Sequence, residues 1–210
     1  MSQGEEHYWD NFYSFIEKTD NKMPPSQFAA FCRLELVHLN INQLIEIAAG
    51  EGRDSIFFAS QGIQTIALDK SSKAVNFLKK RISHNKNVSI LNIDAVNENL
   101  PTPKIKNQAC AYYARFFLHT LEEDHLVKFF EKLSSSMKKD DVFFTEYRDD
   151  NDKNLDKAMP DHFRKFYTSH FVNRLANQNK MKCTYEISGK GFAKWGIEDA
   201  FVTRQVFIKE

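Results

Sequence analysis

The sequence predicts an α/β fold whose core is a doubly wound, mostly parallel sheet. Three observations point to this class. Short apolar segments alternate with helical patterns through residues 44–147. Glycines and serines separate these segments. Two late apolar segments follow one another across a short link, which is typical of an antiparallel hairpin at a sheet edge. The length of 210 residues suits one such domain.

Seven segments have the length and apolar character of strands. They cover residues 44–48, 64–68, 88–93, 109–114, 142–147, 182–187 and 202–208. Five further segments have helical spacing or a serine suited to capping a helix. They cover residues 26–37, 53–61, a helix that begins at Ser71 or Ser72, 122–138 and 163–175. Parallel β-α units followed by a hairpin therefore predict a seven-stranded sheet.

The composition argues against several classes of protein. A net charge of +1 creates no strong field for nucleic acid. No apolar run approaches the roughly 20 residues of a transmembrane helix, and the first residues lack a signal-peptide pattern. The three cysteines, Cys32, Cys110 and Cys183, have no zinc-binding spacing, so no metal is expected. We interpret them as reduced thiols of a cytoplasmic protein that has neither a nucleic acid nor a membrane as its partner.

Residues suited to ligand binding lie at or just past the predicted strand ends. They are Gly50, Asp69, Asp94, Arg115 and Tyr147. In doubly wound sheets, ligands bind beyond the carboxyl ends of the strands, near the point where the strand order reverses. We therefore expect a ligand site at this edge of the sheet.

The turn after the first strand carries a family resemblance. Residues 46–52, Glu-Ile-Ala-Ala-Gly-Glu-Gly, resemble motif I of the class I S-adenosylmethionine-dependent methyltransferases. Asp69 stands where that family has the acid ending its second strand, and Asp94-Ala95 resembles its acidic motif near the adenine. The resemblance covers residues 40–210. Within the family, the chain most resembles the branch that methylates small molecules. It implies a Rossmann-like sheet, S-adenosyl-L-methionine as the cofactor and S-adenosyl-L-homocysteine as the product.

The resemblance implies roles at the methionine end of the cofactor. Glu46 would lie under the methionine, and a structural ion pair with Arg53 or a lysine is the alternative. Gly50 and Gly52 would let the backbone approach the cofactor without a Cβ in the way. Ala48 replaces the first glycine of the motif. Its methyl group is tolerable if the turn needs no positive φ at that position.

Further roles are implied at the nucleoside end. Asp69 would accept hydrogen bonds from both ribose hydroxyls, or act as a charge at the start of the next helix. Asp94 would bind the adenine amino group, and the backbone of Ala95 a ring nitrogen. The residues expected to bind the cofactor are Trp9, Tyr13, Glu46, Ala48, Gly50, Gly52, Arg53, Asp69, Lys70, Asp94, Ala95 and Arg115.

Two candidate catalytic side chains follow the fourth predicted strand. Arg115 and His119 are four residues apart, so on a helical turn they would share a face. Because an imidazole titrates near neutral pH, His119 is a candidate general base for an acceptor hydroxyl. The alternatives are a structural histidine and a residue that backs the cofactor.

Basic residues gather after the fifth predicted strand. Arginine, lysine and histidine side chains together suit an anionic group such as phosphate or carboxylate. Lys165 fits a solvated helix face at least as well. The expected acceptor-binding residues are Tyr113, Arg148, His162, Arg164 and Tyr167.

The N-terminal segment, residues 1–39, is rich in aromatic side chains and is expected to form a helical lid on the methyltransferase domain, residues 40–210. Trp9 and Tyr13 would shield the cofactor's sulfonium by cation–π contact. A plain packed helix is the alternative.

The expected function is methyl transfer to a hydroxyl or phosphate oxygen of a small anionic metabolite, or of a glycan or secondary-metabolite precursor. One alternative is a thiol, amine or metalloid acceptor, as in tellurite methylation. Another is a degenerate methyltransferase fold that serves as a partner subunit. A homodimer is compatible with the sequence.

Overall fold

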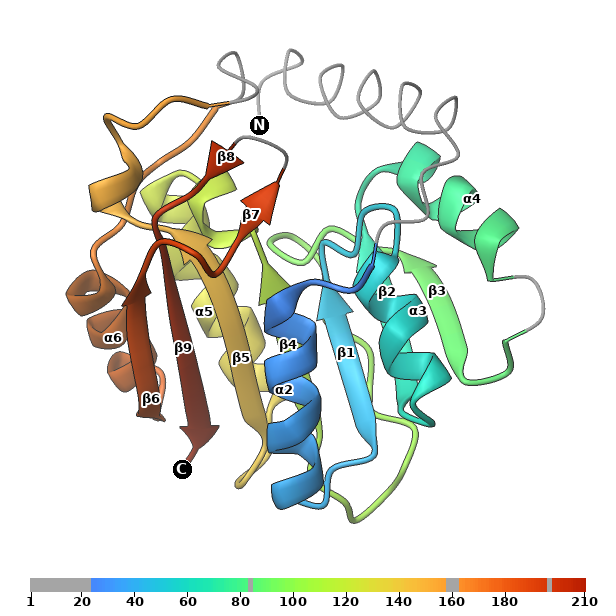
Figure 1. Ribbon diagram of the computed structural model, residues 1–210. Helices are drawn as coiled ribbons and strands as arrows, with labels where there is room; N and C mark the ends of the chain where they lie inside the picture. The colour runs from blue at the N-terminus through green and yellow to red at the C-terminus, as the bar shows by residue number, and fades with distance from the viewer. Residues whose placement is uncertain (1–23, 83–84, 158–162, 196–197) are drawn as a thin grey trace.

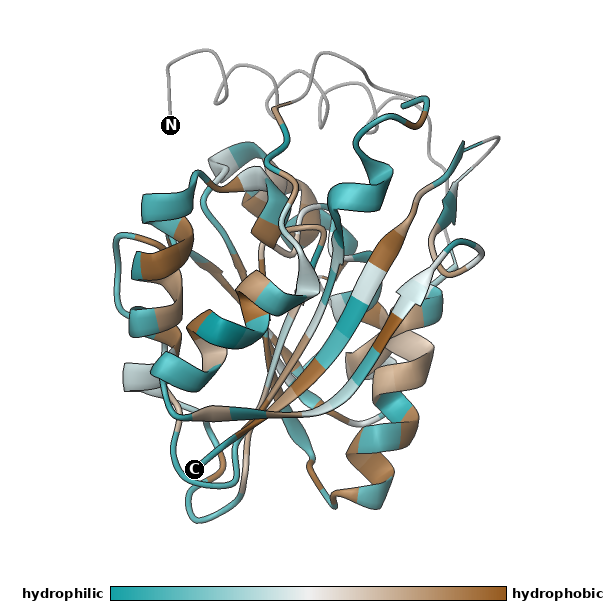
Figure 2. Cartoon of the chain, turned by 90° about the vertical axis from the view of Figure 1, so that its left-hand side faces the viewer, coloured by the Kyte–Doolittle hydropathy of each residue, from teal (hydrophilic) through white to brown (hydrophobic). Residues whose placement is uncertain are grey.

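A seven-stranded sheet forms the centre of the molecule, with helices on both faces (Figure 1). The computed structural model describes residues 24–82, 85–157, 163–195 and 198–210. Seen from the side, the sheet lies between two layers of helices (Figure 2). The architecture confirms the predicted doubly wound, Rossmann-like fold with a C-terminal antiparallel hairpin.

The strands of the main sheet match the seven predicted segments to within a few residues. They are β1 (Gln43–Ile47), β2 (Gln64–Asp69), β3 (Val88–Asn92), β4 (Ala111–Arg115), β5 (Val142–Arg148), β6 (Met181–Gly189) and β9 (Val202–Lys209). The helices are α2 (Gln27–His38), α3 (Arg53–Ser60), α4 (Ser72–Arg81), α5 (Glu123–Ser136) and α6 (Ser169–Gln178).

The sheet order is β3-β2-β1-β4-β5-β9-β6. The first five strands run parallel, and β9 is antiparallel to both β5 and β6. The chain leaves β1 towards β2 on one side and returns to β4 on the other, so the order reverses between β1 and β4. The carboxyl ends of these two strands therefore flank the expected ligand site.

A small two-stranded ribbon interrupts the C-terminal hairpin. It consists of β7 (Lys194–Trp195) and β8 (Glu198–Asp199). In Figure 1 this β7–β8 ribbon lies at the same end of the molecule as the carboxyl ends of the parallel strands. The sequence pattern predicts only a link between two strands at this position.

Each face of the sheet has its own core. One core packs β-strand residues against α5 and α6, through Phe129, Phe130 and Val172 among others. The other packs the sheet against α2 and α3, through Phe28 and Phe58. Residues 24–39 of the predicted lid segment thus contribute to the core, whereas Trp9 and Tyr13 lie outside the described residues.

The predicted helix over residues 163–175 is wrong at its start. Tyr167 forms an isolated bridge with Asp149, so the chain is extended there. Thr168 then caps α6, because its hydroxyl accepts a hydrogen bond from the backbone nitrogen of Phe171 at 3.1 Å. The helix consequently begins at Ser169.

Two findings concern the expected absences. Within the described part of the chain, no helix has the length and hydrophobicity needed to cross a bilayer. Among the same residues, no cluster of histidine, cysteine or acidic side chains is arranged to hold a metal ion. Cys32, Cys110 and Cys183 are free thiols, and the first two are buried.

Candidate functional site

The turn after β1 has a left-handed backbone at three positions. The φ angles are 55° at Ala48, 56° at Gly50 and 73° at Gly52. The backbone nitrogen of Ala49 donates to the Leu68 carbonyl at 2.8 Å, which ties the turn to the end of β2. An alanine at position 48 would be unstrained only if its φ were negative, and the observed φ is positive. Ala48 is held in a region that alanine enters only at a cost of about 1–2 kcal/mol.

Asp69 closes this turn from the neighbouring strand. Its Oδ2 accepts a hydrogen bond from the backbone nitrogen of Gly50 at 2.8 Å, and its Oδ1 accepts one from Ser71, also at 2.8 Å. Burial raises the pKa of the Asp69 carboxyl, and these two backbone donors oppose the rise. The side chain thus fixes the start of α4 and the glycine turn at once.

Gly52 is required by packing. A Cβ at this position would lie 1.9 Å from Cδ1 of Leu78 on α4. Gly52 also lies outside the lining of the cavity described below. Its lack of a side chain lets the start of α3 pack closely on α4, and the predicted approach to the cofactor stays a prediction beside this structural role.

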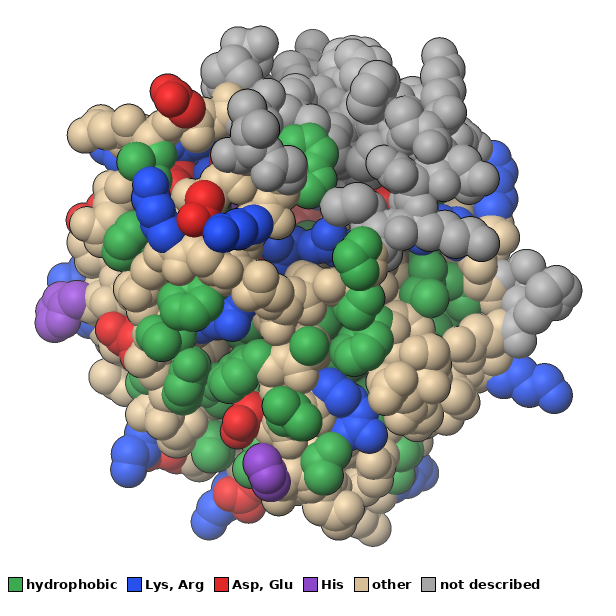
Figure 3. Space-filling model, in the orientation of Figure 1, with side chains coloured by type: hydrophobic (Ala, Val, Ile, Leu, Met, Phe, Trp, Pro, Cys, Tyr) green, Lys and Arg blue, Asp and Glu red, His purple; other side chains and the backbone are tan. Residues whose placement is uncertain are grey.

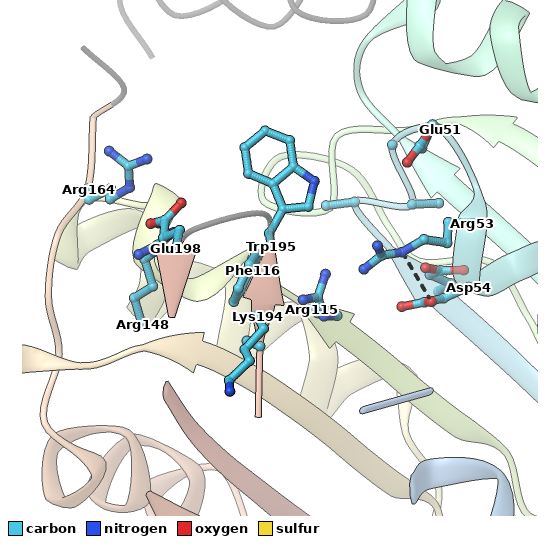
Figure 4. Close-up of a pocket in the computed structure, with 15 residues that line it drawn as sticks. Glu51, Arg53, Asp54, Arg115, Phe116, Arg148, Arg164, Lys194, Trp195 and Glu198 are labelled. Carbon is cyan, nitrogen blue, oxygen red and sulfur yellow. Dashed lines mark hydrogen bonds and ion pairs between the residues drawn. The ribbon is translucent and has the colours of Figure 1, made fainter. Parts of the chain in front are cut away.

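A cavity of about 260 Å³ opens beside this turn (Figure 4). It is lined by the turn after β1, the start of α3, the ends of β4 and β5, and the β7–β8 ribbon. The lining residues are Glu46, Ala48, Ala49, Gly50, Glu51, Arg53, Asp54, Arg115, Phe116, Arg148, Arg164, Ala193, Lys194, Trp195 and Glu198. Figure 3 shows Lys and Arg side chains gathered around the recess at this end of the molecule.

Glu46 is a buried carboxyl in the cavity wall, with only 4% of its surface exposed. Its Oε2 accepts a hydrogen bond from the Ser55 hydroxyl. Burial raises its pKa well above the ordinary value, and the nearby Asp54 raises it further, while Ser55 and Arg53 act in the opposite direction. Glu46 forms its hydrogen bond with this serine, and Arg53 forms its ion pair with Asp54 instead of Glu46.

The Asp54 side chain, in the first turn of α3, joins three parts of the structure by hydrogen bonds. Its carboxylate accepts hydrogen bonds from the Ser26 backbone nitrogen (2.8 Å), the Ser26 hydroxyl (2.7 Å) and the Tyr113 hydroxyl (2.7 Å). Arg53 Nε lies 3.7 Å from the same group, too far for a hydrogen bond. The Arg53 guanidinium points into the cavity and, among the described residues, keeps only this ion pair with Asp54 (Figure 4).

Arg115 presents its guanidinium to the cavity in a fixed orientation. Its Nε donates to Glu146 at 2.8 Å, and the other oxygen of Glu146 accepts from Arg204 Nε at 2.7 Å. Glu146 is fully buried, so this shared carboxylate anchors both arginines. Among the described residues, the two terminal nitrogens of Arg115 have no hydrogen-bond partner. They are available to a ligand.

The Phe116 ring contacts two of the arginine side chains that line the cavity. Its φ is 56°, a strained angle for a residue with a side chain. The Arg115 guanidinium lies 4.2 Å from the centre of its ring, and the Arg148 guanidinium lies 5.4 Å from it. Arg148 in turn pairs with Asp152 at 2.7 Å and with Glu198 of the β7–β8 ribbon.

The β7–β8 ribbon supplies residues that sequence reasoning missed. Lys194, Trp195 and Glu198 all line the cavity. The indole of Trp195 projects between the turn side, with Arg53, and the side that carries Arg148 (Figure 4). A tryptophan in the polar link between two late strands was the available signal.

Three predicted site residues are buried and lie outside the cavity lining. Tyr113 is fully buried on the α2–α3 face of β4, where its ring stacks on Phe28 at 5.2 Å. Tyr167 is 5% exposed, and its hydroxyl donates to the Leu121 carbonyl at 2.9 Å. His119 is 3% exposed, and its Nδ1 accepts a hydrogen bond from the Arg148 backbone nitrogen at 3.2 Å. These are core residues.

The remaining expected residues divide between the site and its surroundings. Arg148 and Arg164 line the cavity, whereas His162 lies outside the described residues. Lys165 is 46% exposed, 3.9 Å from Glu122, which fits a solvated position. The nucleoside-end residues Asp69, Lys70, Asp94 and Ala95 follow β2 and β3 and are not part of the cavity lining.

Asp94 also closes a turn. Its Oδ1 accepts from the Val96 backbone nitrogen at 2.9 Å, and its Oδ2 accepts from the Asn97 amide at 2.9 Å. Burial alone would raise its pKa, but these donors and Lys70 outweigh it, so the pKa is lowered. The carboxylate stays ionised and keeps acceptor capacity for a further donor.

Comparisons with known proteins agree with this geometry. A family model described as a methyltransferase domain matches residues 44–140. A search of curated proteins by sequence gives no match. A S-adenosylmethionine-dependent methyltransferase from Clostridium acetobutylicum ATCC 824 superposes with a TM-score of 0.70 at 12% identity, over 97% of this chain and 99% of that one.

Two further solved structures are similar. The CcbJ methyltransferase from Streptomyces caelestis has a TM-score of 0.68 at 12% identity, over 89% of this chain and 90% of that one. The glycopeptide N-methyltransferase MtfA has a TM-score of 0.68 at 12% identity, over 90% of this chain and 97% of that one. At such identities the likeness shows a shared fold.

Residues 44–140 match a methyltransferase domain, and the chain has the fold of the class I S-adenosylmethionine-dependent methyltransferases. The glycopeptide N-methyltransferase MtfA, which shares this fold, has been solved in complex with S-adenosyl-L-methionine. The residues present fit that cofactor. Gly50 leaves the cavity wall without a Cβ beside the turn, and Glu46 and Arg53 offer opposite charges for the ammonium and carboxylate of an amino acid.

Proposed function

We propose that this enzyme methylates an oxygen of a small anionic metabolite. The observation that carries the proposal is the position of Arg115 in the same cavity as the glycine turn. Its terminal nitrogens have no hydrogen-bond partner among the described residues, so they can hold an anion beside the methyl donor. Arg148 and Arg164 extend the cationic lining away from the turn.

We assign the cofactor's amino-acid end to the turn side of the cavity. Gly50 and Ala48 would supply the backbone surface, Glu46 a carboxylate and Arg53 a guanidinium. Asp69 would accept from the ribose hydroxyls with the acceptor capacity left beside Gly50 and Ser71. Asp94, Ala95 and Lys70 would face the nucleoside. The positions of these residues after β1, β2 and β3 support the assignment.

When bound, the cofactor supplies a methyl group on a positively charged sulfur. The protein then has to hold the acceptor oxygen in line with that methyl group, and alignment of this kind can provide much of the rate enhancement. The His119 imidazole is buried and accepts a backbone hydrogen bond, which argues against its role as the base. An acceptor oxygen that is already ionised, such as that of a phosphate or carboxylate, needs no base, and we favour that member of the class.

Calorimetry with the purified protein tests the cofactor assignment. We expect S-adenosyl-L-methionine to bind with micromolar affinity, and Asp69→Ala to abolish the binding while the fold persists by circular dichroism. No binding by the unmodified protein would contradict the function and would instead support a degenerate methyltransferase fold.

A panel of acceptors with an isotopically labelled methyl donor tests the acceptor class. The panel should contain carboxylates, phosphates, neutral alcohols, thiols, amines and tellurite. We expect labelled product with the anionic oxygen compounds. Transfer only to a thiol, an amine or tellurite would overturn the oxygen assignment and leave the methyltransferase itself in place.

A further inference from the structure

The β7–β8 ribbon places an aromatic ring, that of Trp195, in the wall of the cavity. Trp195 is 46% exposed, although it lines the cavity. Among the described residues its indole contacts no other aromatic ring and no cation. Figure 4 shows the ring projecting between the turn after β1 and the ends of β4 and β5. The exposed part of the indole is therefore available to a ligand.

The other aromatic ring of the cavity is already used. Phe116 has the Arg115 guanidinium 4.2 Å from its centre and the Arg148 guanidinium 5.4 Å from it. A ligand that stacks in this cavity therefore meets Trp195. Stacking on an indole favours planar, conjugated groups over saturated ones of the same size.

The charged side chains of the cavity determine which charge on the ligand is favoured. Its lining carries five basic side chains (Arg53, Arg115, Arg148, Arg164 and Lys194) and four acidic ones (Glu46, Glu51, Asp54 and Glu198). The cofactor's sulfonium adds one more positive charge. A second cation is thus disfavoured near Trp195, while an anion gains from the terminal nitrogens of Arg115.

We propose that the acceptor is a planar conjugated carboxylate, whose ring stacks on Trp195 and whose charged group binds Arg115. Trp195 then determines specificity in the cavity. This inference rests on the proposed function and narrows its anionic acceptor to an aromatic acid. It concerns recognition, so it holds whether the recognised carboxylate or a second oxygen of the same molecule receives the methyl group.

Calorimetry on the full-length protein saturated with S-adenosyl-L-homocysteine tests the inference. The probes are benzoate, which has ring and charge, cyclohexanecarboxylate, which has charge without a conjugated ring, and benzyl alcohol, which has the ring without charge. We expect benzoate to bind about tenfold more tightly than either of the others. Equal affinities, or no saturable binding of benzoate, would overturn the inference.

Variants then locate the contact. We expect Trp195→Ala to weaken benzoate binding about tenfold and Trp195→Phe to restore most of it, because a phenyl ring still stacks. Leu34→Ala, on the exposed surface of α2, is the control and should leave benzoate binding unchanged. Unchanged benzoate affinity in Trp195→Ala would contradict the proposed stacking.

Trp195→Ala also tests whether the indole contacts the acceptor or the sulfonium of the cofactor. If Trp195 instead covered the sulfonium, Trp195→Ala would weaken binding of the cationic S-adenosyl-L-methionine but spare the uncharged S-adenosyl-L-homocysteine, and that result would overturn the inference. Failure of either cofactor form to bind the unmodified protein would count against the proposed function itself. The two failures are therefore distinguishable.

Discussion

The backbone nitrogen of Gly50 donates a hydrogen bond to Oδ2 of Asp69 over 2.8 Å, which joins the turn after β1 to the end of β2. The other carboxylate oxygen accepts from Ser71 at the start of α4. One side chain therefore shapes the cofactor-binding turn and, by our proposal, also binds the ribose. Loss of the carboxylate should affect folding and cofactor binding together.

We predict that Asp69→Asn lowers the free energy of unfolding by about 1–3 kcal/mol, because its amide offers one acceptor oxygen where the carboxylate uses two. Cofactor binding should weaken in parallel. Urea unfolding without ligand and calorimetry with S-adenosyl-L-methionine measure the two effects separately. Asp156→Asn makes the same charge change at an exposed position and should alter neither. An unfolding energy for Asp69→Asn equal to that of the unmodified protein would count against the bridging role.

The sequence carried enough information for the sheet and the glycine turn, for physical reasons. Each buried strand is a short apolar run, and each strand end that faces a ligand carries a polar residue or a glycine. The same patterns could not predict on which face of the sheet the Tyr113 side chain lies. A strand covered on both faces is apolar at every position, so alternation does not tell which side chain faces the core and which the site.

Two other features depend on the folded context. The left-handed angle of Ala48 occurs in a turn whose next residue, Ala49, is hydrogen-bonded to Leu68, and alanine itself gives no sign of it. The β7–β8 ribbon has only two residues in each strand, too few for a periodic pattern. Trp195 therefore reads as part of a link until the fold brings it to the cavity.

Ala48→Gly should stabilise the enzyme. Glycine adopts a φ of 55° freely, so about 1–2 kcal/mol of strain is removed, while the greater entropy of glycine in the unfolded chain offsets about 0.4–1 kcal/mol. We expect a net gain on the order of 0.5–1 kcal/mol, measured by thermal unfolding. Ala48→Val is the opposing control and should be destabilising, because a branched side chain tolerates positive φ least. A lower melting temperature for Ala48→Gly would show that the alanine methyl contributes packing of its own.

Gly52→Ala should destabilise the protein strongly, because the new Cβ would lie 1.9 Å from Cδ1 of Leu78. Overpacking and the left-handed φ together suggest a loss of roughly 2–4 kcal/mol. Gly62→Ala is a matched control: its φ is 81°, but nothing lies within 4 Å of the added Cβ, so only the backbone cost applies.

The double variant Gly52→Ala/Leu78→Ala isolates the contact. Because the shorter side chain makes room for the new methyl group, the double variant should be more stable than the sum of the single changes predicts. Simple additivity in denaturant unfolding would mean that the clash with Leu78 is relieved elsewhere.

Arg115 and Arg204 share the buried carboxylate of Glu146 and form a matched pair for separating recognition from stability. Arg115→Lys and Arg204→Lys should each cost a similar amount of stability, about 1–3 kcal/mol, since each removes a charged hydrogen bond to Glu146. Only Arg115 lines the cavity. We therefore expect Arg115→Lys to raise KM for an anionic acceptor about tenfold, whereas Arg204→Lys leaves it within twofold. Equal KM values in the two variants would remove Arg115 from the acceptor site.

Glu46 should give the stability of the free enzyme a distinct pH dependence. Burial is the main cause that raises the pKa of this carboxyl above its ordinary value, so the folded state holds the proton more tightly than the unfolded chain does. The contribution of Glu46 to stability is therefore most favourable at low pH. It is lost as the pH rises from about 4.3, the ordinary glutamate value, through the raised pKa of the folded state.

Glu46→Gln removes this titration and retains an acceptor for the Ser55 hydroxyl. The variant should be more stable than the unmodified enzyme at neutral pH, by on the order of 1–3 kcal/mol, and the difference should shrink towards about pH 4. Urea unfolding across that range measures it. If Glu46 also binds the positively charged part of the cofactor, the same variant should bind S-adenosyl-L-methionine more weakly. A stability difference that is constant across the pH range would show that the Glu46 carboxyl does not titrate differently in the folded and unfolded states.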